Sequence, residues 1–334
     1  MPPIPVPPAS GIVAGVDFGR TWLRFGAADR NGTLITQDRV ATRPERGPDA
    51  VIATIVDGLR SAVAAAGRSP DALRAIAIGA PGPLDPDRGV LLSPPNLPGW
   101  DEVPLATRVE TALGARCRVE HDANLAALAE FRQGAGAGTT NFVYVTASSG
   151  IGAGLILEGR LYRGSHGAAG EFGHIVVDPA GPLCGCGNRG CLEAIASGTA
   201  IASRAQAILS AAPARAAPHG PLARRAAQGP LDGAAVAEAA AAGDVGAALV
   251  LRSAAHQLGL AVGGLVNLLG PDAVAVGGGV TQAGPPFWEA LRQGLIEGSI
   301  PSVLARCRVG PARLGQEQGL VGALAWAAVA AQGT

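Results

Sequence analysis

The residues with the clearest chemical potential lie in one glycine- and proline-rich segment, residues 171–193. This segment contains one histidine and three cysteines: His174, Cys184, Cys186 and Cys191. Three thiolates and one imidazole match a tetrahedral structural zinc site, which a glycine-rich loop can surround. Because the chain has only five cysteines, we predict zinc rather than three reduced cysteines beside an unrelated histidine. Glu171 and Glu193 bracket the cluster, so the ion would also hold two acidic side chains in place.

Residues 120–124, with the sequence EHDAN, carry the best candidate for a catalytic base. An aspartate at a helix start, here Asp122, can accept a proton from a substrate hydroxyl group, as phosphoryl transfer requires. Aspartate is also a favoured N-cap residue, so Asp122 alone fits a structural role equally well. The phosphate-binding turns and the metal loop elsewhere in the chain favour catalysis. His121 either donates to a substrate hydroxyl group or is a structural histidine.

Three glycine-rich turns, each beside a predicted strand, have the composition of phosphate-binding loops. In the first, Asp17 can orient hydrated Mg²⁺, while Gly19 and Thr21 offer a backbone N–H group and a hydroxyl group to phosphate oxygens. The second turn contains Ser149, Gly150 and Gly152, and the third contains Gly277, Gly278 and Gly279. One such turn alone indicates an ordinary hairpin, but three of them favour a protein that binds a nucleotide.

A proline-stiffened loop at residues 93–100 presents one amide and one indole. Asn96 can donate and accept hydrogen bonds at once, which suits a vicinal diol. The structural alternative is a rigid turn that Trp100 anchors as its hydrophobic residue.

The elements that must position these residues alternate between strands and helices. A strand–turn–strand pattern at residues 12–29 recurs at 141–157, which indicates two related lobes facing one cleft. Further strands are predicted at 72–83, 117–120 and 272–280, and helices at 49–66, from 121, at 233–269 and from 319. This alternation predicts an α/β protein with sheets covered on both faces. Residues 1–10 are expected to be a disordered proline-rich tail, and residues 205–232 a surface excursion.

Composition argues against several classes of function. The net charge is zero, the sequence pI is about 7.0 and aromatic residues make up 4%, so we expect no surface for nucleic acid. The chain has no lysine, which excludes a Walker-type phosphate-binding lysine. The N-terminus lacks a signal-peptide pattern, and no unbroken apolar run reaches membrane-spanning length. Cysteines in a metal pattern suit a reducing environment, so we expect a cytoplasmic protein without a membrane partner.

These motifs together resemble the ROK family (repressors, open reading frames and kinases of sugars), in particular its bacterial glucokinase-like members. The resemblance covers about residues 12–330 and is most specific in GAAGEFGH (167–174) followed by CGCGNRGCLE (184–193). Further motifs occur in the family's order at residues 17–21, 80–83, 96–100, 121–124, 258–271 and 276–280.

The resemblance implies an actin-like ATPase (ribonuclease H-like) fold, with sugar and ATP in a cleft between two lobes. The small α/β lobe is expected at residues 11–119 plus 319–334, and the large α/β lobe, with the zinc loop (174–191), at 120–318. Asp122 would be the base that activates the sugar 6-hydroxyl group. The sugar would contact Asn96, His121, Asp122, Glu171, His174 and Glu193. ATP and Mg²⁺ would contact Asp17, Gly19, Arg20, Thr21 and the second and third turns, and a homodimer is the family expectation.

Five positions depart from the family pattern. Arg20 replaces a usual glycine and Trp22 a common lysine; an arginine here either stabilises the transferred charge or crowds the turn. The second turn has Ser148-Ser149-Gly150 where Gly-Thr-Gly is usual, which keeps a hydroxyl group and the capacity to turn. His121 replaces the usual asparagine, a change that bears on sugar preference more than on catalysis.

The leading hypothesis is an ATP-dependent hexokinase of carbohydrate metabolism, a glucokinase of glycolysis that uses ATP and Mg²⁺ and carries structural Zn²⁺. Alternatives change the sugar to N-acetylglucosamine, N-acetylmannosamine, mannose or fructose. A sugar-responsive regulator of the family would carry a winged helix-turn-helix before the first turn, and we expect the residues before Asp17 to be too few for one. A weakened, non-catalytic sugar binder is a third hypothesis, against which Asp17 and Asp122 argue.

Overall fold

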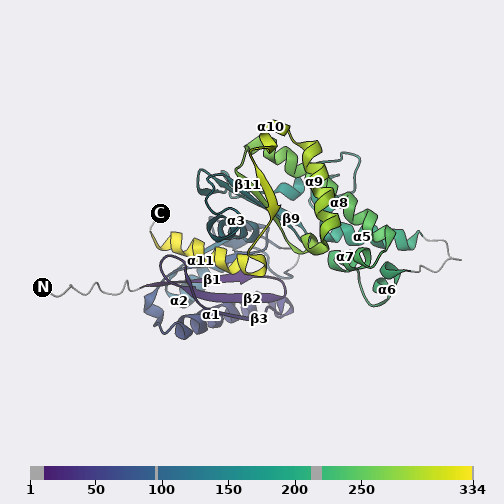
Figure 1. The fold of residues 1–334 in the computed structure, drawn as a ribbon. Helices are drawn as coiled ribbons and strands as arrows, with labels where there is room; N and C mark the ends of the chain where they lie inside the picture. Colours follow the sequence, from purple (N-terminus) through teal and green to yellow (C-terminus); the bar gives the residue numbers. More distant parts are fainter. Residues whose placement is uncertain (1–10, 95–96, 212–219, 333–334) are drawn as a thin grey trace. The chain divides into compact units, whose positions relative to one another are not determined.

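The structure, a computed structural model, describes residues 11–94, 97–211 and 220–332 (Figure 1). The predicted tail at 1–10 and the predicted sugar-binding residue Asn96 therefore lie outside the described residues. The chain forms two compact units. Unit 1 comprises the described residues up to 130, residues 164–167 and the residues from 316, and unit 2 comprises residues 131–163 and 168–315. The two lobes expected from the sequence, with their boundaries, remain a prediction.

Unit 1 is built on a five-stranded mixed sheet. Its strands, in spatial order, are β3 (Leu34–Ala41), β2 (Trp22–Ala28), β1 (Ile12–Phe18), β4 (Leu73–Ala80) and β7 (Arg116–His121). β1, β2 and β3 form an antiparallel meander, whereas β1, β4 and β7 run parallel. Two short strands, β5 (Leu84–Asp85) and β6 (Val90–Leu91), pair separately. The predicted hairpin at residues 12–29 is confirmed.

Unit 2 repeats this topology. Its sheet has the order β10 (Arg160–Tyr162), β9 (Ile151–Leu157), β8 (Phe142–Ala147), β11 (Ala273–Gly277) and β12 (Arg308–Pro311). β8, β9 and β10 are antiparallel, whereas β8, β11 and β12 are parallel. The strand–turn–strand pattern that recurs in the sequence therefore corresponds to a duplicated sheet, and the predicted α/β class is confirmed.

Helices cover both faces of the unit 1 sheet (Figure 1). α1 (Gly47–Ala65) and α2 (Leu105–Leu113) pack on one face, and α11 (Gln318–Ala331) packs on the other. Residues of β1 alternate between these layers, because successive side chains of a strand face opposite sides. Val16 and Phe18 join the core under α1, whereas Val13 joins the core under α11. Asp17 consequently faces α11.

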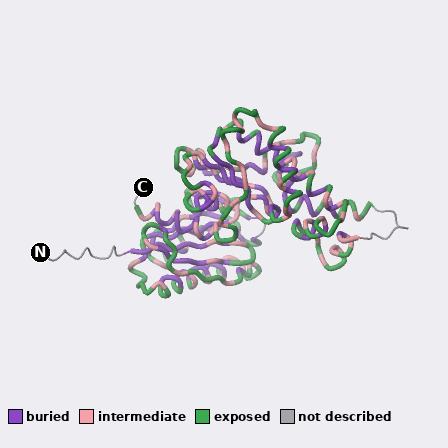
Figure 2. Tube along the Cα trace, viewed as in Figure 1, coloured by how far each residue is buried: buried purple, intermediate pink, exposed green. Residues whose placement is uncertain are grey.

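The helices of unit 2 pack mainly on its sheet and on one another, and Figure 2 shows buried residues in the strands and on the inward faces of these helices. They are α4 (Leu192–Ala196), α5 (Gly198–Ser210), α6 (Pro221–Ala227), α7 (Gly233–Ala241), α8 (Val245–Leu269), α9 (Pro285–Gly298) and α10 (Pro301–Leu304). The described part of the predicted surface excursion at 205–232 is mostly exposed or half-buried, but it is helical, which the sequence analysis did not predict. α5 extends to Ser210, and Leu222 of α6 is buried in the unit 2 core. Alanine-rich composition hid these helices, because alanine gives little periodic signal.

The helices α8 and α9 touch through their backbones at glycine. A methyl group added at Gly259 of α8 would overlap the carbonyl oxygen of Leu291, and one added at Gly294 of α9 would overlap a carbonyl oxygen of α8. One turn further along α8, a methyl group at Gly263 would lie 2.7 Å from the carbonyl carbon of Gly298. By length and composition, α8 is the one described helix that could cross a membrane, but half of its apolar window is buried, as in a core helix.

We expect Gly259→Ala to lower the free energy of unfolding by about 1–3 kcal/mol, because the added methyl group must push α8 and α9 apart. Gly264→Ala on the same helix is the matched control. Nothing lies within 4 Å of its added methyl group, so this change should be neutral or stabilise by up to about 1 kcal/mol through helix propensity. Denaturant unfolding followed by circular dichroism compares the two variants. Equal stability would show that the helices separate without cost.

Candidate functional site

The candidate residues of unit 1 lie where parallel strands end. Asp17 is the penultimate residue of β1, and Asp122 directly follows β7 as the first residue of α3 (Asp122–Gln133). Across the sheet, Asp17 pairs with Gly79 of β4, and Gly79 pairs with Glu120 of β7. Because the three strands are parallel, their carboxyl ends meet at one edge, where open α/β sheets commonly bind ligands.

Asp17 is held from two sides within unit 1. Its Oδ2 accepts a hydrogen bond from Nη1 of Arg24 at 2.8 Å, and these residues are register partners on β1 and β2. At the start of α11, a methyl group added at Gly319 would lie 2.6 Å from Cγ of Asp17. Burial raises the pKa of the Asp17 carboxyl group; the charge of Arg24 opposes this rise, and the charge of Asp122 adds to it. Asp17 and Asp122 therefore influence each other electrostatically.

The first glycine-rich turn joins β1 to β2 and contains Gly19, Arg20 and Thr21. The N–H group of Gly19 donates to the carbonyl oxygen of Trp22 at 3.0 Å, and the hydroxyl group of Thr42 donates to the carbonyl oxygen of Gly19 at 2.6 Å. Arg20 and Thr21 are exposed. Arg20 is not among the non-glycine residues with positive φ, so the turn accommodates an arginine without left-handed backbone.

A buried pair of side chains supports the strand–helix junction that carries Asp122. Glu120 and Asn124 are 0% and 1% exposed. Oε1 of Glu120 accepts hydrogen bonds from Nδ2 of Asn124 and from the backbone N–H group of His121, both at 2.9 Å. Asp122 itself is exposed, and its Oδ1 accepts from the N–H group of Ala123 at 2.7 Å. Sequence reasoning missed the support from Glu120 and Asn124, although both belong to the EHDAN motif.

Two further residues singled out in the sequence, His121 and Trp100, pack against neighbouring residues of unit 1. The ring of His121 lies over the loop after β4, where a methyl group added at Gly82 would lie 2.9 Å from Cε1 of the histidine. Trp100 is 1% exposed, and its ring centre is 5.1 Å from that of Phe18. Trp100 therefore anchors the loop that precedes it, as the structural alternative for this segment predicted.

In unit 2 the second and third glycine-rich turns lie together. β8 and β11 are parallel neighbours, so the turn at 148–152 and the glycines from Gly277 leave the sheet at the same edge. Gly278 has a φ of 99°, and a methyl group there would lie 2.7 Å from Oγ of Ser148. The N–H group of Gly279 donates to the same Oγ at 3.3 Å. The second turn, with Ser149, Gly150 and Gly152, therefore lies beside the third turn, Gly277–Gly279. The first turn belongs to unit 1.

The four predicted metal ligands converge in unit 2. One ligand atom from each of His174, Cys184, Cys186 and Cys191 lies within 4.8 Å of the others. Sγ of Cys184 is 3.6 Å from Nδ1 of His174, and Sγ of Cys186 is 3.6 Å from Sγ of Cys191. In a tetrahedral zinc site, bonds of about 2.3 Å to sulfur and 2.0–2.1 Å to nitrogen give S···N edges of about 3.6 Å and S···S edges of about 3.8 Å. The donor set and these two distances therefore fit a tetrahedrally coordinated ion.

The two glutamates that bracket the cluster have different surroundings. Oε2 of Glu171 is 3.8 Å from Nε2 of His174, whose Nδ1 faces the cysteines. Metal binding through Nδ1 would leave Nε2 as a donor beside Glu171. Glu193, in the first turn of α4, accepts the backbone N–H group of Ile151 on its Oε2 at 2.9 Å. This contact joins the metal segment to the second glycine-rich turn, and no local sequence pattern indicates it.

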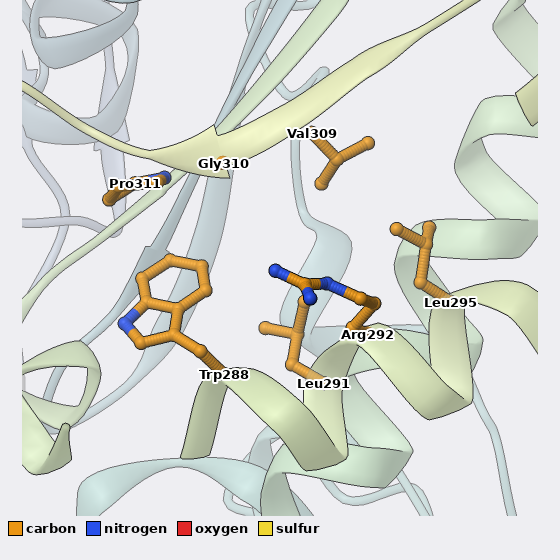
Figure 3. Close-up of a pocket in the computed structure, with 7 residues that line it drawn as sticks. All are labelled: Trp288, Leu291, Arg292, Leu295, Val309, Gly310 and Pro311. Carbon is orange, nitrogen blue, oxygen red and sulfur yellow. The ribbon is translucent and has the colours of Figure 1, made fainter. Parts of the chain in front are cut away.

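A cavity elsewhere in unit 2 involves none of these residues. It lies between α9 and β12 and has a volume of about 190 Å³. Figure 3 shows the indole of Trp288 and the guanidinium of Arg292 beside the aliphatic side chains that line it. Ligand pockets usually measure about 300–1,000 Å³. We therefore treat the carboxyl edge of each sheet, and the metal loop of unit 2, as the candidate sites.

Comparisons with known proteins point to one family. A model of the ROK family matches residues 13–330. A glucokinase of Thermotoga maritima is 33% identical over 311 residues, which cover 92% of this chain and 95% of the relative. The crystal structure of a ROK hexokinase from Thermus thermophilus is 35% identical with a TM-score of 0.81, covering 97% of this chain and 100% of that one. A ROK glucokinase from Streptomyces griseus, solved with glucose and AMPPNP, is 36% identical with a TM-score of 0.75, covering 95% of this chain and 99% of that one.

The partly buried carboxyl group of Asp17 leads to a pH-dependent prediction. Its folded-state pKa is raised above an unfolded value of about 3.9, so its contribution to stability is present below that pH and is lost as the pH rises through the folded-state pKa. Asp17→Asn removes the charge. We expect this variant to raise the Tm of the ligand-free protein by ~2–4 °C at pH 7 and by less at pH 4, measured by calorimetry.

Asp57→Asn is the control for this experiment, because the Asp57 side chain on α1 is 77% exposed. It should leave the Tm unchanged at both pH values. A lower Tm for Asp17→Asn at pH 7 would show that the ion pair with Arg24 outweighs the cost of burying the carboxylate.

Proposed function

The chain belongs to the ROK family, and on this basis we propose that it is an ATP-dependent glucokinase, which transfers the γ-phosphoryl group of ATP to the 6-hydroxyl group of glucose. Relatives named glucokinase match 92% and 94% of the chain at 33% and 35% identity, which supports this activity. The observation that carries the proposal is Asp122. It is an exposed carboxylate at the carboxyl end of three parallel strands, close enough to Asp17 to raise the pKa of that residue.

Asp122 is proposed as the general base. Its carboxylate accepts the proton of the sugar hydroxyl group while that oxygen attacks phosphorus, a role that contributes about 10²–10⁴-fold to such reactions. Phosphoryl transfer needs little covalent chemistry from the protein, so a correctly placed base and stabilised phosphate charge account for most of the catalysis. The buried Glu120–Asn124 hydrogen bond fixes the start of α3 and thereby the position of Asp122.

The three glycine-rich turns are proposed to bind the phosphates of ATP. Backbone N–H groups and hydroxyl groups in such turns form concave anion sites. The residues assigned to this role are Asp17, Gly19, Arg20, Thr21, Ser149, Gly150, Gly152, Gly277, Gly278 and Gly279. Asp17 would hold hydrated Mg²⁺, which neutralises phosphate charge when bound. Arg20, exposed on the first turn, supplies positive charge in a chain without lysine.

The sugar is proposed to contact residues that combine donors and acceptors for hydroxyl groups. Beside Asp122 these are Asn96, His121, Glu171, His174 and Glu193. Glucose is the proposed substrate, and N-acetylglucosamine, N-acetylmannosamine, mannose and fructose are the alternatives within the same chemistry.

The Cys₃His cluster is proposed to bind a structural Zn²⁺. Four protein ligands complete a tetrahedral shell, so no coordination position remains for a substrate. The ion would stabilise the loop that presents Glu171, His174 and Glu193. Reduced cysteines of this kind suit the cytoplasm, where we place the enzyme. From the family resemblance we also expect a homodimer.

ADP release with ATP and Mg²⁺, measured across a panel of hexoses and N-acetylhexosamines, tests the proposed activity. We expect turnover with glucose, and a loss of about 10²–10⁴-fold in kcat for Asp122→Asn with little change in sugar affinity. Asp57→Asn, at an exposed carboxylate remote from the proposed site, is the matched control. Turnover with a different sugar would correct the substrate, and full activity of Asp122→Asn would contradict the base. Sugar binding without turnover would identify a non-catalytic binder.

Metal analysis tests the cluster separately. We expect about one zinc ion per chain by mass spectrometry, and expect Cys186→Ser to lose it together with sugar affinity and thermal stability, because metal binding and local folding are coupled. Cys307→Ser is the control, since Cys307 lies outside the cluster. Unchanged stability and kinetics after removal of the metal would contradict a structural role.

A further inference from the structure

The second glycine-rich turn, residues 148–152, is held by a segment that is distant in sequence. The carbonyl oxygen of Ser148 accepts the N–H group of Gly198 at 2.7 Å. The carbonyl oxygen of Ser149 accepts both the N–H group of Thr199, at 3.3 Å, and its hydroxyl group, at 2.8 Å. These bonds leave the start of α5 in direct contact with the beginning of the turn.

Glu193 holds the other end of the same turn. Its Oε2 accepts the N–H group of Ile151 at 2.9 Å. A methyl group added at Gly150 would lie 2.5 Å from the same oxygen, so a side chain at this position would displace the carboxylate. Hydrogen bonds to a charged acceptor are roughly twice as strong as neutral ones. The carboxylate is therefore a substantial constraint on the turn.

The segment that carries Glu193 begins at a metal ligand. Cys191 is the N-cap residue of α4, and Glu193 follows in the first turn of that helix. The N–H group of Leu192 donates to the carbonyl oxygen of Ile175 at 3.0 Å, and Ile175 directly follows the ligand His174. An ion bound to both ligands would close this loop. The position of the Glu193 carboxylate then follows from the metal cluster.

We propose that Glu193 is a positioning residue for the nucleotide-binding turn in addition to a sugar contact, and that the metal cluster sets the geometry of this turn through it. The inference rests on the proposed function, because that function assigns residues 148–152 to ATP. One carboxylate then serves two ligands: Oε2 orients the N–H groups of the turn, and the same side chain faces the sugar. Loss of the metal would weaken nucleotide binding as well as sugar binding.

Two substitutions at Glu193 separate these roles. Glu193→Gln keeps the length of the side chain and an oxygen that can accept the N–H group of Ile151, but it removes the charge. Glu193→Asp keeps the charge but is one methylene group shorter, so it loses the bond to the turn. A residue that contacted only the sugar would change only sugar binding in either variant.

The test is calorimetric titration of the full chain with Mg²⁺ and a non-hydrolysable ATP analogue without sugar, and separately with glucose without nucleotide. We expect Glu193→Asp to weaken binding of the analogue about tenfold, as for loss of one charge-assisted hydrogen bond. Glu193→Gln should bind the analogue within about threefold of the unchanged protein while binding glucose more weakly. Zinc content and Tm are measured for each variant.

Two variants outside Glu193 extend the test. Thr199→Val removes the side-chain bond to Ser149 and should weaken analogue binding while leaving glucose affinity unchanged. Gly150→Ala displaces the Glu193 carboxylate without altering it, so both affinities should fall. These variants distinguish a disturbed turn from a lost sugar contact even if one Glu193 variant folds poorly.

Each outcome decides the inference. Unchanged analogue binding by Glu193→Asp, in a protein that binds zinc and unfolds at the normal temperature, would overturn it and leave the proposed kinase intact. If the unchanged protein bound no ATP analogue and released no ADP, the proposed function itself would fail and the inference with it. If removal of zinc weakened binding of the ATP analogue by about as much as Glu193→Asp does, the result would support the link to the metal.

Discussion

Parallel strand pairing is the constraint on which the rest of the candidate site depends. In each unit, three neighbouring strands run in the same direction, and the first continues into an antiparallel hairpin. Parallel pairing brings the carboxyl ends of these strands to one edge, where the chain must leave the sheet in a turn or a helix. Asp17 and Asp122 lie at that edge in unit 1, and the glycines from Gly277 lie at the equivalent edge in unit 2. Because the sheet is duplicated, each unit has a group of polar residues at the carboxyl ends of its parallel strands.

At these edges, each important carboxylate has a partner that determines its direction. Asp17 is paired with Arg24, Glu120 with Asn124, and Glu193 with a backbone N–H group. A partly buried carboxylate without such a partner would lose hydration and gain little in return. These partners limit the rotamers of the acidic side chains before any ligand binds. The arrangement is consistent with preorganisation, in which the cost of orienting charged groups is met during folding rather than during the reaction.

Local sequence signals predicted both strand–turn–strand pairs, the parallel strands β4, β7 and β11, the helices α1 and α8 and the convergence of the metal ligands, because each depends on periodicity or on closely spaced residues. The strand β3 and the helix α9 were not predicted. The contact between Glu193 and Ile151 had no such signal, since it depends on how closely two distant backbones approach. The support of Asp122 by Asn124 lay within a predicted motif but depends on burial, which short-range patterns report poorly. Alanine-rich α6 was missed because its apolar face contains little besides Leu222.

The contact between Gly319 and Asp17 has a consequence for the order in which the protein takes shape during its synthesis. β1 emerges early from the ribosome, but the helix that covers its Asp17 face begins only at Gln318, after every residue of unit 2 has been made. Unit 2 takes no residue from this helix, and the segment that carries its metal ligands, residues 174–191, has left the ribosome before the helix is made. Unit 1 cannot complete its fold until α11 has been made, because α11 packs on the unit 1 sheet through contacts of very high sequence separation. The nascent chain thus acquires its metal loop first and the surroundings of its N-terminal aspartate last.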